Sequence, residues 1–206
     1  MFNSQSQAKQ DVFVHTLHPT TGRFFDIGSH DPIRINNTYA LEQLGWTGYL
    51  FDIDAKWSAP TKAIRTSPFV CTDVSTFDWN RFLESEGLVG AQFDYLSFDV
   101  DEASLATLER FPFHNLSFRV CTIEHDSYRF GVARAERMRQ ILTSHGYRIV
   151  CKDVKNQGNA YEDWYVHSSF PLDTTSIECE GLEWTEVIRR LQTNFQAPSS
   201  GVLGPQ

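Results

Sequence analysis

Residues 22–28 read GRFFDIG, an apolar run that ends in Asp26 and a turn glycine, and this stretch decides the fold. The same pattern recurs in GYLFDID (48–54), FVCTD (69–73), YLSFDVD (95–101) and RVCTIEHD (119–126). Successive acidic residues, from Asp26 to Glu124, lie 21 to 26 residues apart, which fits one strand, one helix and two short loops. In open parallel sheets, ligands bind outside the carboxyl ends of the strands. The pattern therefore predicts an α/β sheet with a binding site along one rim.

The composition is typical of a globular domain, with 206 residues, 41% hydrophobic and 21% charged. A net charge of −8 disfavours nonspecific nucleic-acid binding, which needs basic surface. No apolar run reaches the roughly 18 residues that a membrane span requires, and the first residues lack the apolar core of a signal peptide. We expect a cytoplasmic protein (in a host cell, if the sequence is viral) with a small-molecule or glycan partner, and neither a nucleic acid nor a membrane as partner.

Four cysteines are present: Cys71, Cys121, Cys151 and Cys179. None forms a CxxC pair, which disfavours a structural zinc site. Three of them lie in apolar, strand-like runs, so we expect buried free thiols and a reducing compartment.

Hydrophobic periodicity and turn residues divide the chain into alternating strands and helices. The expected strands are 23–28, 47–53, 69–73, 93–99 and 118–124, followed by 147–154 and 160–169, which the short segment NQGN joins. The expected helices are 4–18, 36–44, 57–66, 78–87, a segment with Leu105 and Leu108 that ends before Pro112, then 131–145 and 182–194. Residues 1–195 are predicted to form one domain, and 196–206 a disordered tail.

The order of these elements predicts a mostly parallel sheet with helices on both faces and an antiparallel hairpin at one edge. NAD-binding and flavodoxin-like folds do not usually end in such a hairpin, whereas class I methyltransferases, which use S-adenosylmethionine, usually do. The predicted fold class is therefore α/β, with the Rossmann-like sheet of a class I methyltransferase.

The loop after the first strand contains one glycine, Gly28, where a dinucleotide site would need GxGxxG. S-adenosylmethionine carries no phosphate, so this loop suits it better. Asp52 ends the second strand and can accept hydrogen bonds from both ribose hydroxyls, with Asp54 as an alternative. Asp73 can reach the adenine amino group. Simpler explanations remain open, since a lone turn glycine and a strand-end aspartate that caps a helix are both common.

The fourth and fifth strands end in Asp99-Val100-Asp101 and Glu124-His125-Asp126, and the hairpin adds Glu162-Asp163-Trp164. Histidine titrates near neutral pH, so His125 can take a proton from a substrate hydroxyl, with Asp99 or Glu124 holding its ring. Structural ion pairs to arginine and a structural role for His125 are the competing explanations.

Taken together, several stretches resemble the FkbM family of S-adenosylmethionine-dependent methyltransferases, in its short single-domain branch of viral and environmental sequences. These stretches are SQAKQD (6–11), FFDIGSHDP (24–32), NNTYALEQLGWTGYLFDID (36–54), FDYLSFDVD (93–101), IEHDSYRFG (123–131), HGYRIVCKDV (145–154) and YEDWYVH (161–167). The resemblance implies a class I fold, cofactor contacts from Gly28, Asp52 and Asp73, and an acceptor hydroxyl, in many relatives on a sugar or secondary metabolite.

Two departures from the family pattern are visible. The family often has Glu-Pro after the second strand, where this chain has Asp52-Ile53, and Asp-Val-Glu-Gly after the fourth, where it has Asp-Val-Asp-Glu (99–102). The first change keeps an acid for the ribose, while the second leaves the base and the acceptor open. Two other functions also remain open: a glycosyltransferase that uses Asp99-Val100-Asp101 as a DxD motif for a metal–diphosphate, and a non-catalytic module with this fold.

The predicted function is methylation of a hydroxyl, on a carbohydrate or glycan, with S-adenosylmethionine as cofactor and a divalent metal left open. The predicted catalytic residues are His125, Asp99 and Glu124, and the predicted cofactor residues are Asp26, Gly28, Ser29, Thr38, Asp52, Ile53, Asp73, Val74 and Asp99. The predicted substrate residues are Asp101, Asp126, Tyr128, Arg129, Asp163 and Trp164. Any metal would take its ligands from Asp99, Asp101 and Asp126, because carboxylates suit magnesium.

Overall fold

A computed structural model describes residues 2–171 and 173–195, so the predicted disordered tail lies outside the described residues. Eight strands form one sheet in the order β3-β2-β1-β4-β5-β7-β6-β8. Their bounds are β1 Arg23–Ile27, β2 Thr47–Asp52, β3 Phe69–Cys71, β4 Ala91–Phe98, β5 Leu116–Glu124, β6 Tyr147–Asn156, β7 Asn159–His167 and β8 Cys179–Glu180. The first five strands are parallel, and β7 is antiparallel to both β5 and β6. The predicted α/β sheet is confirmed.

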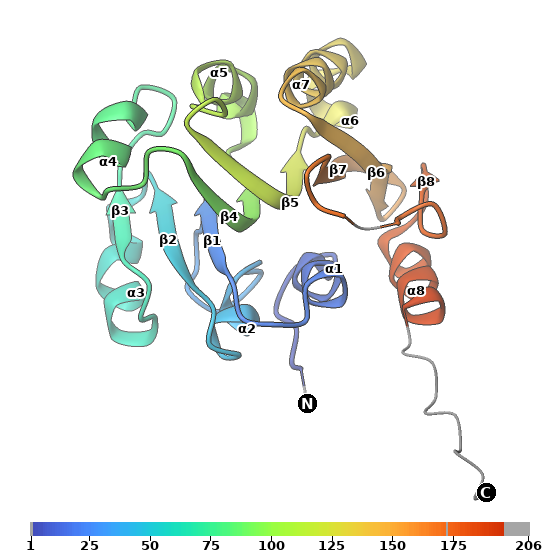
Figure 1. Ribbon diagram of the computed structural model, residues 1–206, viewed down its shortest axis with the longest axis horizontal. Coiled ribbons are helices and arrows are strands. Elements are labelled where there is room, and N and C mark those ends of the chain that lie inside the picture. Colours follow the sequence, from blue (N-terminus) through green and yellow to red (C-terminus); the bar gives the residue numbers. More distant parts are fainter. Residues whose placement is uncertain (1, 172, 196–206) are drawn as a thin grey trace, which may run out of the picture.

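Helices cover both faces of this sheet (Figure 1). The helices and 3-10 turns are α1 Gln10–Leu17, α2 Tyr39–Glu42, η1 Ala55–Trp57, α3 Ser58–Ile64, α4 Trp79–Ser85, η2 Asp101–Ala103, α5 Ser104–Arg110, α6 Ser127–Phe130, α7 Val132–Ser144 and α8 Trp184–Asn194. Helices α4, α5 and α7 lie on one face, and α1, α2 and α8 on the other. Each face therefore buries its own apolar layer against the sheet.

The two apolar layers come from the alternation of side chains along the central strands, which sends neighbours to opposite faces. Phe25 of β1 points into the layer under α4, α5 and α7, where it packs against Phe93 with ring centroids 4.7 Å apart. Its neighbour Phe24 points into the layer under α1, α2 and α8. Both phenylalanines are fully buried. A sheet covered on both sides leaves only its ends open, and the carboxyl ends of β1–β5 share one rim.

The hairpin of β6 and β7 ends in a two-residue turn, Gln157-Gly158, flanked by the paired residues Asn156 and Asn159. Both turn residues have positive φ, 53° and 83°, as the tight turns of twisted hairpins require. The predicted hairpin is confirmed, but its outer strand is not the sheet edge. The two-residue strand β8 pairs with β6 in parallel and forms the edge instead. Two residues carry too little periodicity to be predicted from sequence.

Local differences from the predicted elements have clear causes. The helix expected over 36–44 is only the four-residue α2. The Asn36 side chain accepts from the N–H groups of Thr38 and Tyr39 before it starts, and the N–H groups of Leu44 and Gly45 bond to carbonyls three residues back, which ends it. Cys71 is exposed, against the expectation of burial, because it ends the short outer strand β3. All four thiols are free. Among the described residues, no helix has the length and apolar character of a membrane span.

Candidate functional site

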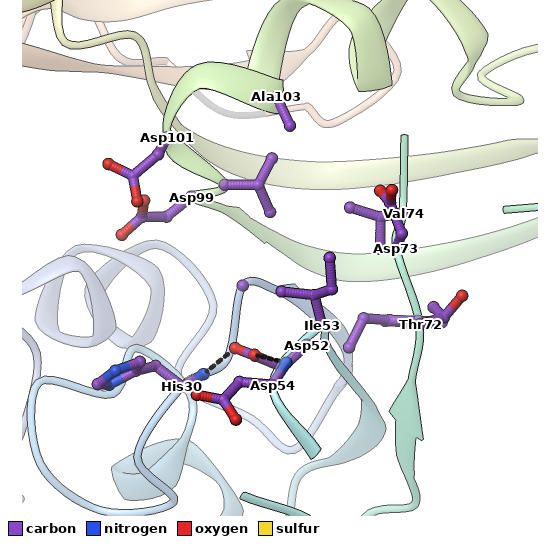
Figure 2. Close-up of a pocket in the computed structure, with 13 residues that line it drawn as sticks. His30, Asp52, Ile53, Asp54, Thr72, Asp73, Val74, Asp99, Asp101 and Ala103 are labelled. Atoms are coloured by element: carbon purple, nitrogen blue, oxygen red, sulfur yellow. Dashed lines mark hydrogen bonds between the residues drawn. The ribbon is translucent and has the colours of Figure 1, made fainter. Parts of the chain in front are cut away.

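A cleft of about 330 Å³ opens where β1, β2, β3 and β4 end (Figure 2). We call it the first cleft. It is lined by Gly28, His30, Phe51, Asp52, Ile53, Asp54, Thr72, Asp73, Val74, Asp99, Val100, Asp101 and Ala103. Six of the nine predicted cofactor residues are among them: Gly28, Asp52, Ile53, Asp73, Val74 and Asp99. Figure 2 shows Asp99 and Asp101 on one side and Asp52 and Asp54 on the other.

The Asp52 carboxylate is held in place by the backbone of two loops. Oδ2 accepts a hydrogen bond from the backbone N–H of His30 at 2.8 Å, and Oδ1 accepts one from the N–H of Asp54 at 2.8 Å. Each oxygen keeps a further lone pair that can accept from a ligand hydroxyl. Asp54 differs, because its side chain caps η1 and pairs with Lys56 at 2.5 Å. The geometry thus favours Asp52 over Asp54 as the acceptor for a pair of hydroxyls.

Gly28 is required by close packing between two strand ends. Its φ is +86°, and a β-carbon at this position would come within 1.6 Å of the Asp99 carbonyl oxygen. The backbone N–H groups of Gly28 and Ser29 both donate to the Phe51 carbonyl, at 2.9 and 3.0 Å. The loop after β1 is therefore pressed onto β2 and β4. Gly28 is predicted to contact the cofactor, and it lines the cleft, but the atoms that require a glycine here belong to the protein itself.

Three predicted cofactor residues do not line the cleft: Ser29, which is a buried residue of the loop itself, and Asp26 and Thr38, which lie behind it. Asp26 is 2% exposed and accepts a hydrogen bond from the Thr38 hydroxyl at 2.7 Å. Burial raises the pKa of Asp26. The Thr38 hydroxyl in turn accepts from Arg65 at 2.9 Å. These residues fix the loop from below, so their role in the structure is to position the cleft wall.

The wall at the ends of β2 and β3 combines apolar surface with one free carboxylate oxygen. Ile53 is 69% exposed, although it is a large aliphatic residue, and it lines the cleft together with Val74, Val100 and other apolar groups. Asp73 uses Oδ1 to accept from the backbone N–H and hydroxyl of Ser75. Its Oδ2 has no partner among the described residues. A flat heteroaromatic ring with an amino group fits this combination of walls.

At the other end of the cleft, carboxyl groups of neighbouring strands meet. The Asp99 and Glu124 side chains share a hydrogen bond, and the carboxylates of Asp101 and Asp126 lie close by. Burial, together with these negative neighbours, raises the pKa of Asp99 and of Glu124. One of two such groups readily holds a proton and donates it in a hydrogen bond to the other, which stays ionised, as in other paired carboxyls.

The structure brings together only two of the three predicted metal ligands, Asp101 and Asp126. Ligand oxygens of Asp101, Glu124 and Asp126 lie within 4.8 Å of one another, so Glu124 takes the place that the sequence analysis gave to Asp99. Asp101 already pairs with Arg129 at 2.8 Å, which supplies positive charge beside these oxygens.

A second cleft, of about 240 Å³, opens beside the first. It is lined by Gln7, Glu124, Asp126, Tyr128, Asn156, Gln157, Asn159 and Tyr161. The Asp99–Glu124 hydrogen bond joins the two clefts, because Asp99 lines the first and Glu124 the second. Glu124, Asp126 and Tyr128 were predicted site residues. The others were missed: Gln7 and Tyr161 lie in stretches that carry the family resemblance but were given no role, and the residues around the hairpin turn belong to no motif.

His125 is turned away from both clefts, and its placement gives no support to the predicted role of base. The side chain is buried, and Nδ1 accepts a hydrogen bond from the backbone N–H of Ser127 at 3.1 Å. Nε2 lies 3.4 Å from Asp163 Oδ1 and 3.6 Å from Asp153 Oδ1. Both ring nitrogens are thus engaged inside the protein. This arrangement corresponds to the structural alternative left open by the sequence.

The group of His125, Asp153 and Asp163 has the spacing of a metal site, but it holds an arginine. Arg139 donates to Asp163 and to Asp153, each at 2.7 Å. Burial opposes ionisation of Asp163, but hydrogen bonds from His125 and Arg139 outweigh it and lower the pKa of Asp163 to about 2. The guanidinium therefore neutralises the buried carboxylates in place of a metal ion.

The predicted substrate contacts of Asp163 and Trp164 are not compatible with this structure. Asp163 is 1% exposed within the cluster around Arg139, and Trp164 is fully buried. The Trp164 indole packs on Phe13 and donates its N–H to Glu162. The alternation of β7 explains the error, because inward and outward positions of a strand covered on both faces are all buried.

Glu162, which is cross-strand from Glu124, anchors the N-terminal segment to the sheet. Its carboxylate accepts from Gln10 at 3.1 Å and from the hydroxyl of Tyr161 at 3.2 Å. This contact seats α1 on β7 and fixes Gln7, three residues earlier, at the second cleft. Arg129, another predicted substrate residue, instead pairs with Asp101 and is half-exposed at the rim.

Strained backbone conformations occur at both clefts. His30 and Asp101, which line the first, and Asp126 and Gln157, which line the second, all have φ between 45° and 53°. Side chains other than glycine adopt this region at a cost, and such strain gathers at functional sites. No lysine or arginine lines either cleft within the part of the chain that the structure describes. A cationic or neutral ligand therefore fits better than a phosphate.

No protein-family model and no curated protein sequence matches this chain. Solved structures do resemble it. A TehB-like SAM-dependent methyltransferase from Corynebacterium glutamicum superposes with a TM-score of 0.53 at 12% identity, covering 77% of this chain and 87% of that one. A precorrin-6y C5,15-methyltransferase from Geobacter metallireducens gives 0.51 at 11% identity, covering 78% and 89%. Magnesium protoporphyrin IX methyltransferase from Synechocystis, with bound SAM, gives 0.50 at 17% identity, covering 79% of each chain.

At these identities the likeness extends to the fold alone. It agrees with the strand order and with the antiparallel hairpin that follows five parallel strands. The chain has the fold of the class I S-adenosylmethionine-dependent methyltransferases.

Proposed function

We propose that this protein is an S-adenosylmethionine-dependent methyltransferase that acts on a hydroxyl oxygen of a carbohydrate or glycan. The observation that carries the proposal is the Asp52 carboxylate, which two backbone N–H groups hold at the end of β2, facing a cleft that no lysine or arginine of the described chain lines. A carboxylate so placed accepts from both hydroxyls of a ribose. The acidic cleft also favours a ligand with a positively charged sulfonium.

The residues of the first cleft fit each part of this cofactor. Asp52 would hold the ribose, Ile53 and Val74 would cover the adenine, and the free oxygen of Asp73 would accept from its amino group. Asp99 lies at the opposite end. When bound, the cofactor supplies an activated methyl group, which passes to the acceptor oxygen as the C–S bond breaks and the C–O bond forms.

The paired carboxyls Asp99 and Glu124 would then handle the acceptor's proton. A hydroxyl is a weak nucleophile unless its proton is removed, and positioned carboxylates contribute about 10²–10⁴-fold as general bases. The ionised member of the pair would accept this proton, while the protonated member keeps the two side chains together. Most of the remaining rate would come from holding donor and acceptor in line.

The resemblance to the FkbM family supports an oxygen acceptor, and we extend the proposal to membership of that family. We also propose that residues 1–195 form one catalytic domain. The glycosyltransferase alternative is weaker. Asp101 pairs with Arg129 and Asp99 with Glu124, so both carboxylates already have partners, and no lysine or arginine that could bind a diphosphate lines the first cleft among the described residues.

Thermal denaturation with added ligands tests this proposal. The protein is heated with S-adenosylmethionine, with its demethylated product S-adenosylhomocysteine, or with UDP-sugars and manganese. A ligand at about 100 times its dissociation constant adds about 2.7 kcal/mol of stability. We expect a rise in melting temperature with the first two ligands and none with the third. A rise only with UDP-sugars and manganese would support a glycosyltransferase.

A further inference from the structure

The second cleft has the chemistry of a binding site for a sugar. Its polar groups come from three separate segments: Gln7 before α1, Glu124 and Asp126 after β5, and the side chains around the hairpin turn. Planar amides and carboxylates place two polar atoms side by side, so that each can engage two neighbouring hydroxyls. Tyr128, at 57% exposed, stands at the rim with a face that can stack on the C–H side of a ring.

Gln157 gives independent evidence that this cleft is functional. It is the first residue of the two-residue turn and has φ of 53°, a position where asparagine, aspartate or glycine is strongly preferred. Glutamine has a longer side chain and no local hydrogen bond to offset the strain. No hydrogen bond of its side chain is found among the described residues. Gln157 is exposed at the cleft, so its amide is available to a ligand there, and the strain of its backbone agrees with a functional position.

The size and charge of the cleft restrict what it can hold. Its 240 Å³ are below the roughly 300–1,000 Å³ of pockets that enclose a whole drug-sized ligand, so one ring fits and the remainder of an acceptor extends into solvent. Two carboxylates and no lysine or arginine line it in the described chain. Arg129, which follows Tyr128 in the chain, and Arg134 are bound to the carboxylate and the carbonyl of Asp101. A diphosphate would therefore meet repulsion here.

We propose that the second cleft is the acceptor subsite and that it binds one uncharged sugar ring that carries no phosphate. This inference rests on the proposed function, because Glu124 joins the subsite to the methyl-donor end of the first cleft. It also sets an order of reactions. A glycosyl transfer, which consumes the nucleotide-linked sugar, would come before methylation, so that the methyl group is added to a sugar already free of its diphosphate.

Saturation-transfer NMR tests this inference with the intact protein and a defined set of probes. The probes are neutral methyl glycosides of common hexoses and deoxyhexoses, the corresponding sugar 1-phosphates, and UDP- and GDP-linked sugars, each with and without S-adenosylhomocysteine. We expect at least one neutral glycoside to receive saturation through its ring protons, and its phosphorylated forms to receive several-fold less. Equal or stronger signals from the phosphorylated sugars would overturn the proposal, and so would the absence of a saturation-transfer signal from every neutral probe.

The decisive variant is Gln157→Gly, because it separates stability from binding. Glycine accepts positive φ without strain, so the melting temperature should stay the same or rise while the sugar signal falls at least several-fold. The matched control is Ile35→Gly, which relieves the same strain (φ 53°) at an exposed position outside both clefts. It should leave the signal unchanged. A Gln157→Gly protein that still binds the glycoside fully would refute the assignment of the cleft.

Failure of this inference can be told apart from failure of the proposed function. Calorimetry with S-adenosylhomocysteine alone reports on the first cleft, since Gln157 does not line it. Binding of the cofactor product without any binding of sugar would reject the sugar subsite only. Binding of a neutral sugar without the cofactor product would reject the methyltransferase and keep the sugar site.

Discussion

Asp99 and Glu124, at the ends of the neighbouring strands β4 and β5, share a hydrogen bond at the point where the two clefts meet. Asp99 faces the cleft assigned to the methyl donor, and Glu124 faces the one assigned to the acceptor. Two carboxyl groups this close cannot both ionise easily, so burial and mutual repulsion keep one proton on the pair. Under the proposed function, this is the place where the hydroxyl proton of the acceptor would leave.

A raised pKa for this pair predicts the pH dependence of methyl transfer. A base must be unprotonated, so activity should increase as pH rises through the raised pKa of the pair. The rising limb of kcat/KM against pH should therefore lie well above the value of about 4 for an ordinary aspartate. A rate that is flat from pH 5 to 9 would remove the pair from the proton transfer.

Asp99→Asn should lower the rate and leave the cofactor bound. Removal of a general base costs about 10²–10⁴-fold in rate, while the ribose and adenine contacts lie elsewhere in the cleft. Single-turnover methylation and calorimetry on the same preparation give the two values. Equal losses of rate and of cofactor affinity would make Asp99 a cofactor ligand instead of a base.

Asp52→Ala should weaken the binding of S-adenosylhomocysteine without unfolding the protein. Hydrogen bonds to charged groups contribute about 1.5–3 kcal/mol each, and the ribose would lose two of them. Asp54→Ala is the matched control, because Asp54 caps η1 and pairs with Lys56. An effect of the same size in both variants would indicate general damage to the loop.

Ile53→Ala should reduce cofactor affinity, whereas Ile35→Ala should not. The two isoleucines are almost equally exposed, at 69% and 67%, but only Ile53 lines the first cleft. Each buried methylene is worth about 0.8 kcal/mol, so we expect a loss of about 1–2 kcal/mol for Ile53→Ala. Unchanged affinity in that variant would place the adenine elsewhere.

The cluster that His125, Asp153 and Asp163 form around Arg139 should contribute to stability and not to catalysis. Removing one partner of a buried ion pair costs about 3–5 kcal/mol, so Asp163→Asn should be strongly destabilised in urea unfolding. The folded-state pKa of Asp163 is depressed to about 2, so its contribution is present above its unfolded pKa, about 3.9, and is lost as pH falls through 2. Wild-type stability should therefore decline between about pH 4 and pH 2, and that part of the decline should be absent in Asp163→Asn.

His125→Ala belongs with this cluster. We expect it to cost about 1–3 kcal/mol of stability and to leave the rate per folded molecule within a few-fold of wild type. A selective loss of rate in a fully stable variant would restore His125 as the base.

The sequence predicted the sheet well, because acidic residues at evenly spaced strand ends and a final hairpin can be recognised in a single sequence, without an alignment of relatives. Six of the predicted cofactor residues line the first cleft, because Asp52, Asp73 and Asp99 lie at or just after the ends of neighbouring parallel strands, while their contact with a cofactor stays a prediction. What it could not provide was the direction of side chains after the strand ends. His125 and Asp126 are adjacent, yet one is buried against Arg139 and the other lines a cleft. The left-handed backbone conformation of Asp126 turns the two side chains in different directions, and no sequence pattern predicts that conformation.

The second cleft could not be predicted from the sequence, for a different reason. Gln7 is about 150 residues from Gln157 and Tyr161 in the chain, and no sequence pattern assigned any of the three a role. They meet because Gln10 anchors the N-terminal segment on Glu162, and because β7 runs antiparallel to β5 and so begins beside Glu124. The strand order brings these residues together, so the site can be recognised only in the three-dimensional structure.

Calorimetric titration with S-adenosylhomocysteine is the most direct test of the central claim that the first cleft binds this cofactor. We expect saturable binding with one ligand per chain, and a loss of about 1.5–3 kcal/mol or more in Asp52→Ala but not in Asp54→Ala. Absence of binding to the folded wild-type protein at millimolar ligand would contradict it.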